Sequence, residues 1–432
     1  MRRDALGLIV SMMHRHGGLV RLDLGPRPVY LVTHPDLVQE VLQQKHRSVS
    51  KKTFGMAQLS LVVGSGLLTS DGELWRRQRR IAQPAFHSQR LAGFAATMVK
   101  VAEETADRWA GPAASGGEID VGREMMTATL QVVSTTLLGS DLSRAASEVA
   151  DAIDFLLVEI RRRINSPWLP PLAVPTPANR RFQKMRATLD RLLGATIAAR
   201  RRGEERGQDL LQMLVDAVDD ETGERMNDEQ LRDEVVTMFI AGHETTASAL
   251  AWTFYLLSLH PGARERVWAE LDRVLDGRRP ALADLNALPF LGQVLDESMR
   301  LYPPAWIIAR QTAEPMQVGS FDLPEDRTIL LAPFAIHRSP EFWPNPLAFD
   351  PDRFAPDRVS AHHRFQYLPF GAATRMCIGK GFALIEAKLM LATILSRYRL
   401  DLVPDRAVAL EAAVTLRPRD GIHMRVVRRG AA

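Results

Sequence analysis

The amino-acid sequence predicts a mostly helical fold with a minor β region. Helix-periodic patterns of apolar residues recur along most of the chain, over residues 87–110, 119–139, 146–163, 178–202, 228–259 and 290–302. Short apolar or alternating stretches predict strands at 19–34, 305–310, 327–332 and 422–427. Because 46% of the residues are apolar and 25% are charged, the composition is that of a globular protein with a sizeable core.

The chain is expected to form a single domain over residues 1–432. Length alone would allow two or three domains, but the proline-rich segment 166–177 is predicted to be a loop between two helices, because the chain is equally apolar on both sides of it. The glycine-bearing segment 51–70 is also expected to be a loop. The apolar run 5–13 is too short to span a bilayer, and we expect it to form an opening amphipathic helix.

Charge and cysteine content argue against several classes of function. The net charge of +4 is small for 432 residues, and no basic block is interleaved with aromatic residues as in nucleic-acid-binding proteins. One cysteine cannot form an internal disulfide framework, which fits the reducing cytoplasm. We therefore expect a soluble, cytoplasmic, monomeric protein with no nucleic-acid partner and no transmembrane anchor.

The only cysteine lies in a glycine-bearing loop that leads into an apolar, helix-periodic segment. The loop runs from Phe370 and Gly371 to Cys377 and Gly379. A thiol just before a helix feels the positive end of that helix, which favours the thiolate, a good metal ligand. The glycines would let the backbone lie against a planar group, and Arg375 would offer a cation to its acidic edge. The alternative is a buried cysteine that acts as a small hydrophobe.

Polar residues interrupt the middle of the long helix predicted over 228–259. The segment Ala241-Gly242-His243-Glu244-Thr245 follows the apolar Ile240. A glycine inside a helix costs about 1 kcal/mol, so its presence beside an acid and an alcohol indicates a site. The alternative is that Glu244 and Thr245 satisfy each other as a buried polar pair. Because the polar cluster splits the apolar run, it argues against a membrane span.

Two other pairs of residues share one face of a predicted helix. Trp75 and Arg79 are i and i+4, and an indole donor beside a guanidinium suits a carboxylate. Glu297 and Arg300 are i and i+3 in the helix expected over 290–302. Either pair could instead be a solvated surface feature, since exposed ion pairs contribute only about 0–1 kcal/mol.

Together these motifs resemble the signatures of the cytochrome P450 superfamily. The cysteine loop is similar to Phe-x-x-Gly-x-Arg-x-Cys-x-Gly, except that Ala373 stands where the family usually has its second glycine. The long helix resembles Ala-Gly-x-(Asp/Glu)-Thr. Glu297 and Arg300 resemble the Glu-x-x-Arg pair, which a second arginine, here Arg353, locks in the family; Asp352 replaces the usual glutamate. The resemblance covers nearly the whole chain and implies the cytochrome P450 fold, a triangular prism of helices around a buried haem.

The resemblance assigns expected roles to residues of each motif. Cys377 would be the axial thiolate ligand of haem b, and Glu244 and Thr245 would deliver protons to bound dioxygen. Glu297, Arg300 and Arg353 would form a structural staple beneath the haem. The remaining contacts to the haem, including its propionates, are expected from Phe370, Gly371, Arg375, Gly379, Ala241, Gly242, Trp75, Arg79 and Arg310.

The implied activity is that of a haem-thiolate monooxygenase, which inserts one oxygen atom from O2 into an apolar small molecule by hydroxylation or epoxidation. Apolar residues expected around the substrate are Ile240, Ala241, Ala305, Trp306, Ile307 and Val414. Trp306 could instead be packed in the core. A terpenoid is slightly favoured over a fatty acyl, steroid or polyketide substrate, while the site and number of oxidations stay open.

Electrons from NAD(P)H are expected to arrive through partner proteins. The sequence carries no flavin or iron–sulfur motif, so a ferredoxin or flavodoxin with its reductase would dock near Cys377, and the other arginines of 75–80 could take part. The alternatives are a peroxide-driven or non-redox haem-thiolate enzyme and a haem sensor. The acid and alcohol at 244 and 245 argue against the first two, since such enzymes usually lack that pair.

Overall fold

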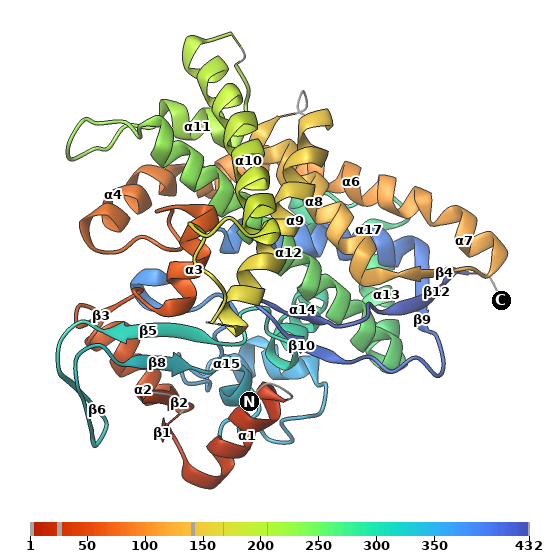
Figure 1. Ribbon diagram of the computed structural model, residues 1–432. Helices are drawn as coiled ribbons and strands as arrows, with labels where there is room; N and C mark the ends of the chain where they lie inside the picture. Colours follow the sequence, from red (N-terminus) through yellow and green to blue (C-terminus); the bar gives the residue numbers. More distant parts are fainter. Residues whose placement is uncertain (1–3, 24–27, 140–142, 167, 205, 431–432) are drawn as a thin grey trace. The chain divides into compact units, whose positions relative to one another are not determined.

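The computed structural model describes residues 4–23, 28–139, 143–166, 168–204 and 206–430 (Figure 1). The chain divides into two compact units, one made of residues 1–50, 92–129 and 244–432, the other of 51–91 and 130–243. Helices predominate in both units, and strands occur only in the first among the described residues. The prediction of a mostly helical fold with a minor β region is therefore confirmed.

The first unit contains the chain's sheets. The largest has five strands in the order β1-β2-β8-β5-β3, with β2 and β8 parallel and the other neighbours antiparallel. The bounds of its strands are β1 Leu19–Leu22, β2 Val29–Val32, β3 Val49–Ser50, β5 Ile308–Thr312 and β8 Thr328–Leu331. Strands β1 and β2 lie within the predicted segment 19–34 and pair antiparallel, while residues 24–27 lie outside the described residues.

Three smaller sheets complete the β structure of this unit. A three-stranded sheet has the order β4-β12-β9, and two hairpins pair β6 with β7 and β10 with β11. The bounds are β4 Glu118–Asp120, β6 Met316–Val318, β7 Phe321–Leu323, β9 Tyr398–Leu402, β10 Leu410–Ala412, β11 Leu416–Pro418 and β12 His423–Arg428. The strand predicted at 422–427 is observed as β12, which pairs with β4 and β9.

The helices of the first unit surround these sheets. The opening helix α1 is capped by Asp4, whose side chain accepts a hydrogen bond from the Gly7 amide at 2.8 Å, and it ends at Gly17, where φ is 78°. Helix α17 packs on α6 and α14 (Figure 1). The helical bounds are α1 Ala5–His16, α2 Pro35–Gln39, η1 Glu40–Gln44, α6 Ala95–Arg108, α7 Ala110–Ser115, α13 Pro261–Leu275, η4 Leu282–Ala287, α14 Pro289–Leu301, α15 Pro333–Ile336, η5 Pro351–Phe354, α16 Pro356–Val359, η6 Ala373–Arg375 and α17 Lys380–Arg397.

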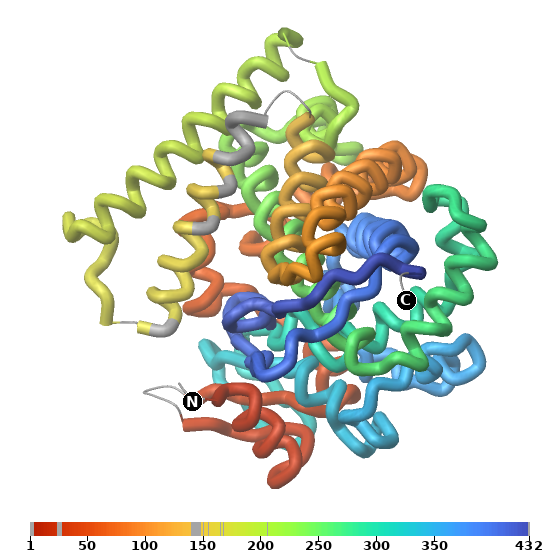
Figure 2. Tube along the Cα trace, turned by 90° about the vertical axis from the view of Figure 1, so that its right-hand side faces the viewer, coloured from red at the N-terminus to blue at the C-terminus, as the bar shows by residue number. Residues whose placement is uncertain are grey.

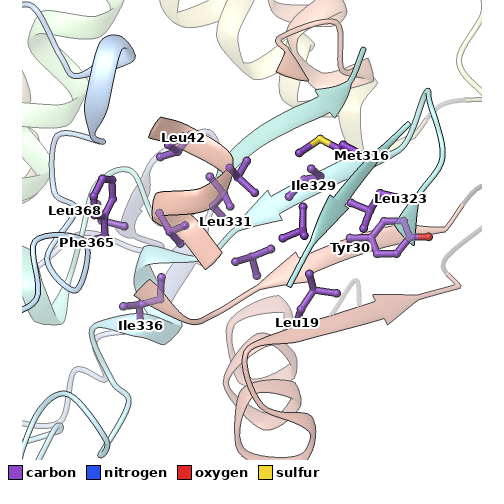
Figure 3. Close-up of a cluster of buried hydrophobic side chains, with 14 residues drawn as sticks. Leu19, Tyr30, Leu42, Met316, Leu323, Ile329, Leu331, Ile336, Phe365 and Leu368 are labelled. Carbon is purple, nitrogen blue, oxygen red and sulfur yellow. The ribbon is translucent and has the colours of Figure 1, made fainter. Parts of the chain in front are cut away.

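A cluster of buried apolar side chains lies beneath the five-stranded sheet (Figure 3). The cluster contains strand residues such as Leu331. It also contains Ile336, Phe365 and Leu368, whose side chains are 0% exposed. Ala372 and Ala373, from the cysteine loop, pack against the same cluster. The sheet core therefore supports the backbone that carries the predicted metal ligand.

The second unit is helical. Its elements are α3 Phe54–Val63, α4 Gly72–Ala82, η2 Gln83–Phe86, α9 Ser143–Asn165, α10 Pro177–Arg202 and α11 Leu210–Asp216, while α5 Ser88–Ala92, α8 Val121–Leu138 and α12 Asp228–Leu259 contribute residues to both units. Helices α9 and α10 run side by side in both views (Figures 1 and 2). Helix α10 begins after Thr176, whose hydroxyl accepts from the Asn179 amide, and ends at Gly203 in the left-handed conformation.

Three local expectations were wrong. The segment 51–70 contains helix α3, which Thr53 caps through a hydrogen bond from the Met56 amide, and is not loop throughout. Asp36, which the sequence suggests as the cap of a short helix to about Lys45, does not supply the N-cap acceptor: His34 does, and the helix changes to π geometry after Gln39. The strand predicted at 305–310 begins only at Ile308.

Candidate active site

The cysteine loop has a tight backbone conformation. Gly371 and Ala373 have φ values of 68° and 56°, in the left-handed region, and the Cys377 amide donates to the Phe370 carbonyl at 2.9 Å. Gly379 then caps helix α17. The Cys377 side chain is exposed just before this helix, where the positive end of the helix dipole favours a thiolate. The geometry favours a ligand over the alternative of a buried hydrophobic cysteine.

Ala373 shows why the departure from the family pattern matters. Glycine adopts a positive φ without steric cost, whereas a Cβ in this region costs roughly 1–2 kcal/mol. Ala373 nevertheless adopts φ of 56°, and its methyl group packs against the buried cluster around Phe365 and Leu368. The loop therefore holds a non-glycine residue in a left-handed backbone conformation that glycine would adopt without steric cost.

His337 connects Leu368, two residues before the cysteine loop, to helix α14 and was missed from the sequence. Its Nε2 accepts from the Leu368 amide at 2.9 Å, and its Nδ1 lies 3.1 Å from the Arg300 carbonyl. Burial, followed by the charges of Arg300 and Arg338, lowers the pKa of His337 to about 3, so the ring is neutral and can donate at Nδ1 while it accepts at Nε2. The only signal in the sequence is a histidine that directly follows a buried apolar stretch.

The predicted staple pair forms a fully buried ion pair. Glu297 and Arg300 are both 0% exposed, and Arg300 Nε and Nη2 donate to the two carboxylate oxygens at 2.6 and 2.7 Å. The other donors of Arg300 bind the carbonyls of His337 and Pro346, each at 2.7 Å, and of Ala348 at 3.0 Å. Because buried charges require such compensation, the alternative of a solvated surface pair is excluded.

The second arginine of the staple also lies where the motif predicts. Arg353 Nε is 3.3 Å from Glu297 Oε1, and Arg353 Nη2 donates to the Asn345 carbonyl at 2.9 Å. Asp352, which replaces the usual glutamate, accepts two hydrogen bonds of 2.8 Å from Arg266 of α13, and this pairing lowers the pKa of its carboxyl. Asp352, although shorter than the usual glutamate, therefore forms a bidentate ion pair with Arg266.

The acid of the long helix has partners from the other end of the chain. Glu244 is 7% exposed, and its Oε1 accepts from the Thr415 hydroxyl at 2.6 Å. Arg417 Nη1 lies 4.0 Å from the same oxygen. Thr415 was not predicted as a functional residue, and no local pattern of the sequence indicates that it contacts a helix 171 positions away.

The small residues of α12 differ in their surroundings. Ala241 is exposed and Thr245 is half-buried, whereas Ile240 is 5% exposed. A Cβ on Gly242 would lie 2.9 Å from Val133 Cγ2, so the glycine permits close packing against α8. His243 Nδ1 lies 2.8 Å from the Phe239 carbonyl within the same helix, so this side chain has a partner inside the helix.

Trp75 and Arg79 line one cavity of the second unit, with a volume of about 390 Å³. Gln83, Pro84 and His87 contribute to the same wall, so an indole, a guanidinium and an imidazole face one space, a donor set that suits a carboxylate. The other arginines of α4 already pair with carboxylates: Arg76 with Glu73, Arg77 with Glu224 and Arg80 with Asp219. Because their charges are already compensated within the chain, these arginines are less suited to bind an electron-donor protein than the sequence suggested.

The remaining predicted residues lie in three segments of the first unit. Arg310 is 7% exposed in β5, and Arg375 ends the short helix η6. Trp306 packs against the buried residues around Phe334 and Leu416 and donates to the Ala413 carbonyl at 2.9 Å, which favours the core-packed alternative for this tryptophan. The other pocket candidates are the half-buried Ala305 and Ile307, and Val414, which is 40% exposed.

These residues fit a haem. Within the first unit, the exposed Cys377 thiol before a helix provides one anionic ligand, and Thr245 leaves accessible surface on an otherwise largely buried stretch of helix. A model of the cytochrome P450 family matches residues 2–422. The chain belongs to the cytochrome P450 family.

This P450 is similar to bacterial proteins over almost its whole length. It is 39% identical to the cyclooctatin synthase of Streptomyces melanosporofaciens over 94% of this chain and 87% of that protein. It is 37% identical to the cyclooctat-9-en-7-ol 5-monooxygenase of the same organism (91% and 85%) and 36% identical to the pentalenene oxygenase of Streptomyces avermitilis (94% and 89%).

Solved structures agree with the family assignment. The crystal structure of the cytochrome P450DA haem domain superposes with a TM-score of 0.89 and 30% identity, covering 98% of this chain and 93% of that one. The P450 fold is therefore confirmed, and the protein is a haem-thiolate monooxygenase that acts on a small molecule with O2. Among the helices in the described part of the chain, none combines the length and apolarity that crossing a membrane requires.

Proposed function

We propose that this P450 hydroxylates a polycyclic terpene hydrocarbon or terpene alcohol. The observation that carries the proposal is that three relatives, 36–39% identical over more than nine-tenths of this chain, are named for cyclooctatin, cyclooctat-9-en-7-ol and pentalenene. The apolar side chains at Ile240, Ala305, Ile307 and Val414 are consistent with such a substrate, because they offer hydrophobic contact and no charge.

The residues have distinct roles in this proposal. Cys377 would hold the iron through its thiolate, and Trp75, Arg79, Arg310 and Arg375 would pair with the propionates. When bound, the haem supplies activation of O2 and transfer of one oxygen atom to a C–H bond. Glu244 would take a proton from water and pass it to the Thr245 hydroxyl, one position further along α12.

Electrons for the reaction would come from a ferredoxin or flavodoxin and its reductase. The chain has one cysteine, which the haem would occupy, so it cannot hold an iron–sulfur cluster as well. Incubation of the purified enzyme with NADPH and substrate should give no sustained turnover until both partner proteins are added. Turnover with NADPH alone would contradict this part of the proposal.

A cytoplasmic location stays a prediction.

The substrate class can be tested by titrating the purified haem protein. Pentalenene and cyclooctat-9-en-7-ol should shift the absorption from water-bound to water-free haem, while lauric acid and testosterone should shift it less at equal concentration. A stronger shift with the fatty acid or the steroid would overturn the terpenoid proposal. Val414→Glu should abolish the shift. Val359→Glu is the matched control, because the two valines are 40% and 41% exposed and Val359 lies in α16.

The role of Thr245 can be separated from substrate binding. Thr245→Ala should leave the spectral shift with pentalenene in place but increase the peroxide released per NADPH consumed, because the hydroxyl that carries protons is lost. Thr245→Ser restores the hydroxyl and should restore coupling. Unchanged coupling in Thr245→Ala would favour the peroxide-driven or non-redox alternatives instead.

A further inference from the structure

We infer that Thr415 is a positioning residue for Glu244, and that the turn 413–416 holds this acid in the orientation that proton delivery needs. The inference rests on the proposed role of Glu244. Thr415 is 6% exposed and Glu244 is 7% exposed, so their hydrogen bond of 2.6 Å is shielded from water. A short bond from a hydroxyl to a carboxylate in such surroundings is stronger than a bond between neutral groups.

The turn that carries Thr415 is fixed from two sides. From α12, the Trp252 indole donates to the Leu416 carbonyl at 3.3 Å. From the segment that precedes β5, the Pro304 carbonyl accepts from the Leu416 amide at 3.0 Å, and the Trp306 indole donates to the Ala413 carbonyl at 2.9 Å. Thr415 is therefore presented to Glu244 by a backbone that neighbouring elements hold in place.

A nearby cation explains why Glu244 needs a positioning residue. Arg417 Nη1 lies 4.0 Å from Glu244 Oε1, and Arg417 Nε donates to Glu411 Oε2 at 2.9 Å. If the Thr415 hydroxyl were absent, a small movement would bring Glu244 into a direct ion pair with Arg417. An ion pair stabilises the carboxylate and makes it a poorer proton carrier. Thr415 and Glu411 thus hold the contact between Glu244 and Arg417 at 4.0 Å, the outer limit of an ion pair.

The same turn carries the pocket candidate Val414. Because Val414 is adjacent to Thr415, a substrate that displaces the turn would also displace the hydroxyl that holds Glu244. The proposed substrate contact, Val414, is therefore linked to Glu244 through the peptide bond to Thr415 and the hydrogen bond of Thr415 to the acid. Oxygen activation would then depend on how well a substrate fits this turn.

The test compares Thr415→Val with two controls in the haem-loaded enzyme, supplied with a ferredoxin, its reductase and NADPH, with pentalenene and with cyclooctat-9-en-7-ol as probes. Thr415→Val should release several-fold more peroxide per NADPH, and Thr415→Ser should behave like the wild type. Thr136→Val is the matched control, because Thr136 is 2% exposed and, in the part of the chain that the structure describes, its hydroxyl bonds only within α8. Equal coupling in Thr415→Val and Thr136→Val would overturn the inference.

The role of Arg417 gives a second test. In the double variant T415V/R417Q the competing cation is absent, so coupling should recover towards the wild-type value. If coupling stays as poor as in T415V, the separation of Glu244 from Arg417 is not the reason for the effect, and the inference is overturned in this form. Glu411→Gln, which releases Arg417, should lower coupling in the same direction as T415V.

A thermodynamic cycle tests the contact without catalysis. Urea unfolding of the wild type, Glu244→Gln, Thr415→Val and the double variant should show a midpoint shift in the double variant that is smaller than the sum of the two single shifts. Additive shifts would contradict the bond between the two side chains. If Glu244→Gln leaves coupling unchanged, the proposed function of Glu244 fails; if only Thr415→Val leaves it unchanged, the positioning inference fails alone.

Discussion

Two buried glutamates, Glu297 and Glu234, show opposite ways of placing an acid inside this protein. Both are 0% exposed. Glu297 accepts two hydrogen bonds from Arg300 and one of 2.8 Å from the Asp350 amide, with Arg353 at 3.3 Å. Glu234 of α12 accepts one bond of 3.1 Å, from the Leu67 amide, and within the described residues its Oε1 has no hydrogen-bond partner.

The difference is one of charge compensation. Glu297 faces two guanidinium groups, so its negative charge is matched inside the protein. Glu234 has the charge of Asp233 as its neighbour, and burial, with a smaller contribution from Asp233, raises its pKa to about 8. The first acid holds the fold as an ion, while the second is held neutral at physiological pH. Glu244 lies between these extremes, with one hydrogen bond and one cation 4.0 Å away.

Removal of the charge that compensates Glu297 should have the largest effect. Arg300→Ala leaves a buried carboxylate and three backbone carbonyls without their donor, and we expect a loss of about 3–5 kcal/mol in the free energy of unfolding. Urea denaturation measures it. Arg266→Ala is the control, because this arginine pairs with Asp352 at the surface and should cost less than about 1 kcal/mol. Equal losses of unfolding free energy in Arg300→Ala and Arg266→Ala would contradict the claim that Glu297 depends on the buried charge of Arg300.

If Arg300→Ala does not fold, Arg353→Lys provides the milder change. Arg353 is 8% exposed and contributes one contact to Glu297. Lysine keeps the charge but loses the forked geometry, so haem content and stability should fall less than in Arg300→Ala yet more than in Arg266→Ala. A stability equal to the wild type would show that the charge alone matters.

Glu234 should make stability depend on pH. Because its pKa is about 8 in the folded state and 4.5 ordinarily, the folded protein binds one more proton than the unfolded chain between these values. Stability should therefore fall as pH rises through this window, by roughly 1 kcal/mol per pH unit from this group. Glu234→Gln keeps the acceptor for the Leu67 amide but removes the titration.

The measurement is urea unfolding of the wild type and of Glu234→Gln from pH 5.5 to 8.5. As pH rises, the unfolding free energy of the wild type should fall relative to that of Glu234→Gln, because only the wild type loses the proton of Glu234. Glu229→Gln is the matched control on the exposed first turn of α12 and should follow the wild type. Parallel curves for the wild type and Glu234→Gln would show that Glu234 is ionised like Glu297.

The smallest effect concerns the backbone of the cysteine loop. Ala373→Gly relieves the positive φ of 56° and should raise the free energy of unfolding by up to about 1 kcal/mol. Ala372→Gly is the control, since Ala372 has an extended φ of −153° and glycine there should destabilise by about 0.5–1 kcal/mol. Destabilisation by Ala373→Gly would mean that packing of its methyl group outweighs the strain.

The comparison also shows what the sequence could predict. Glu297 and Arg300 lie three positions apart in one helix, and Cys377 lies in a continuous ten-residue pattern, so local spacing was sufficient for both. His337 and Thr415 act through contacts with residues far away in sequence, and no spacing indicates such partners. Helix α3 was missed because three glycines in 51–70 outweighed its apolar residues in the prediction.

The central claim is that the Cys377 thiolate binds the haem iron. Freshly purified protein, reduced and treated with carbon monoxide, should show the red-shifted absorption band that an anionic sulfur ligand produces. Cys377→Ser should lack that band. Wild-type protein without haem, or the same band in Cys377→Ser, would contradict the account.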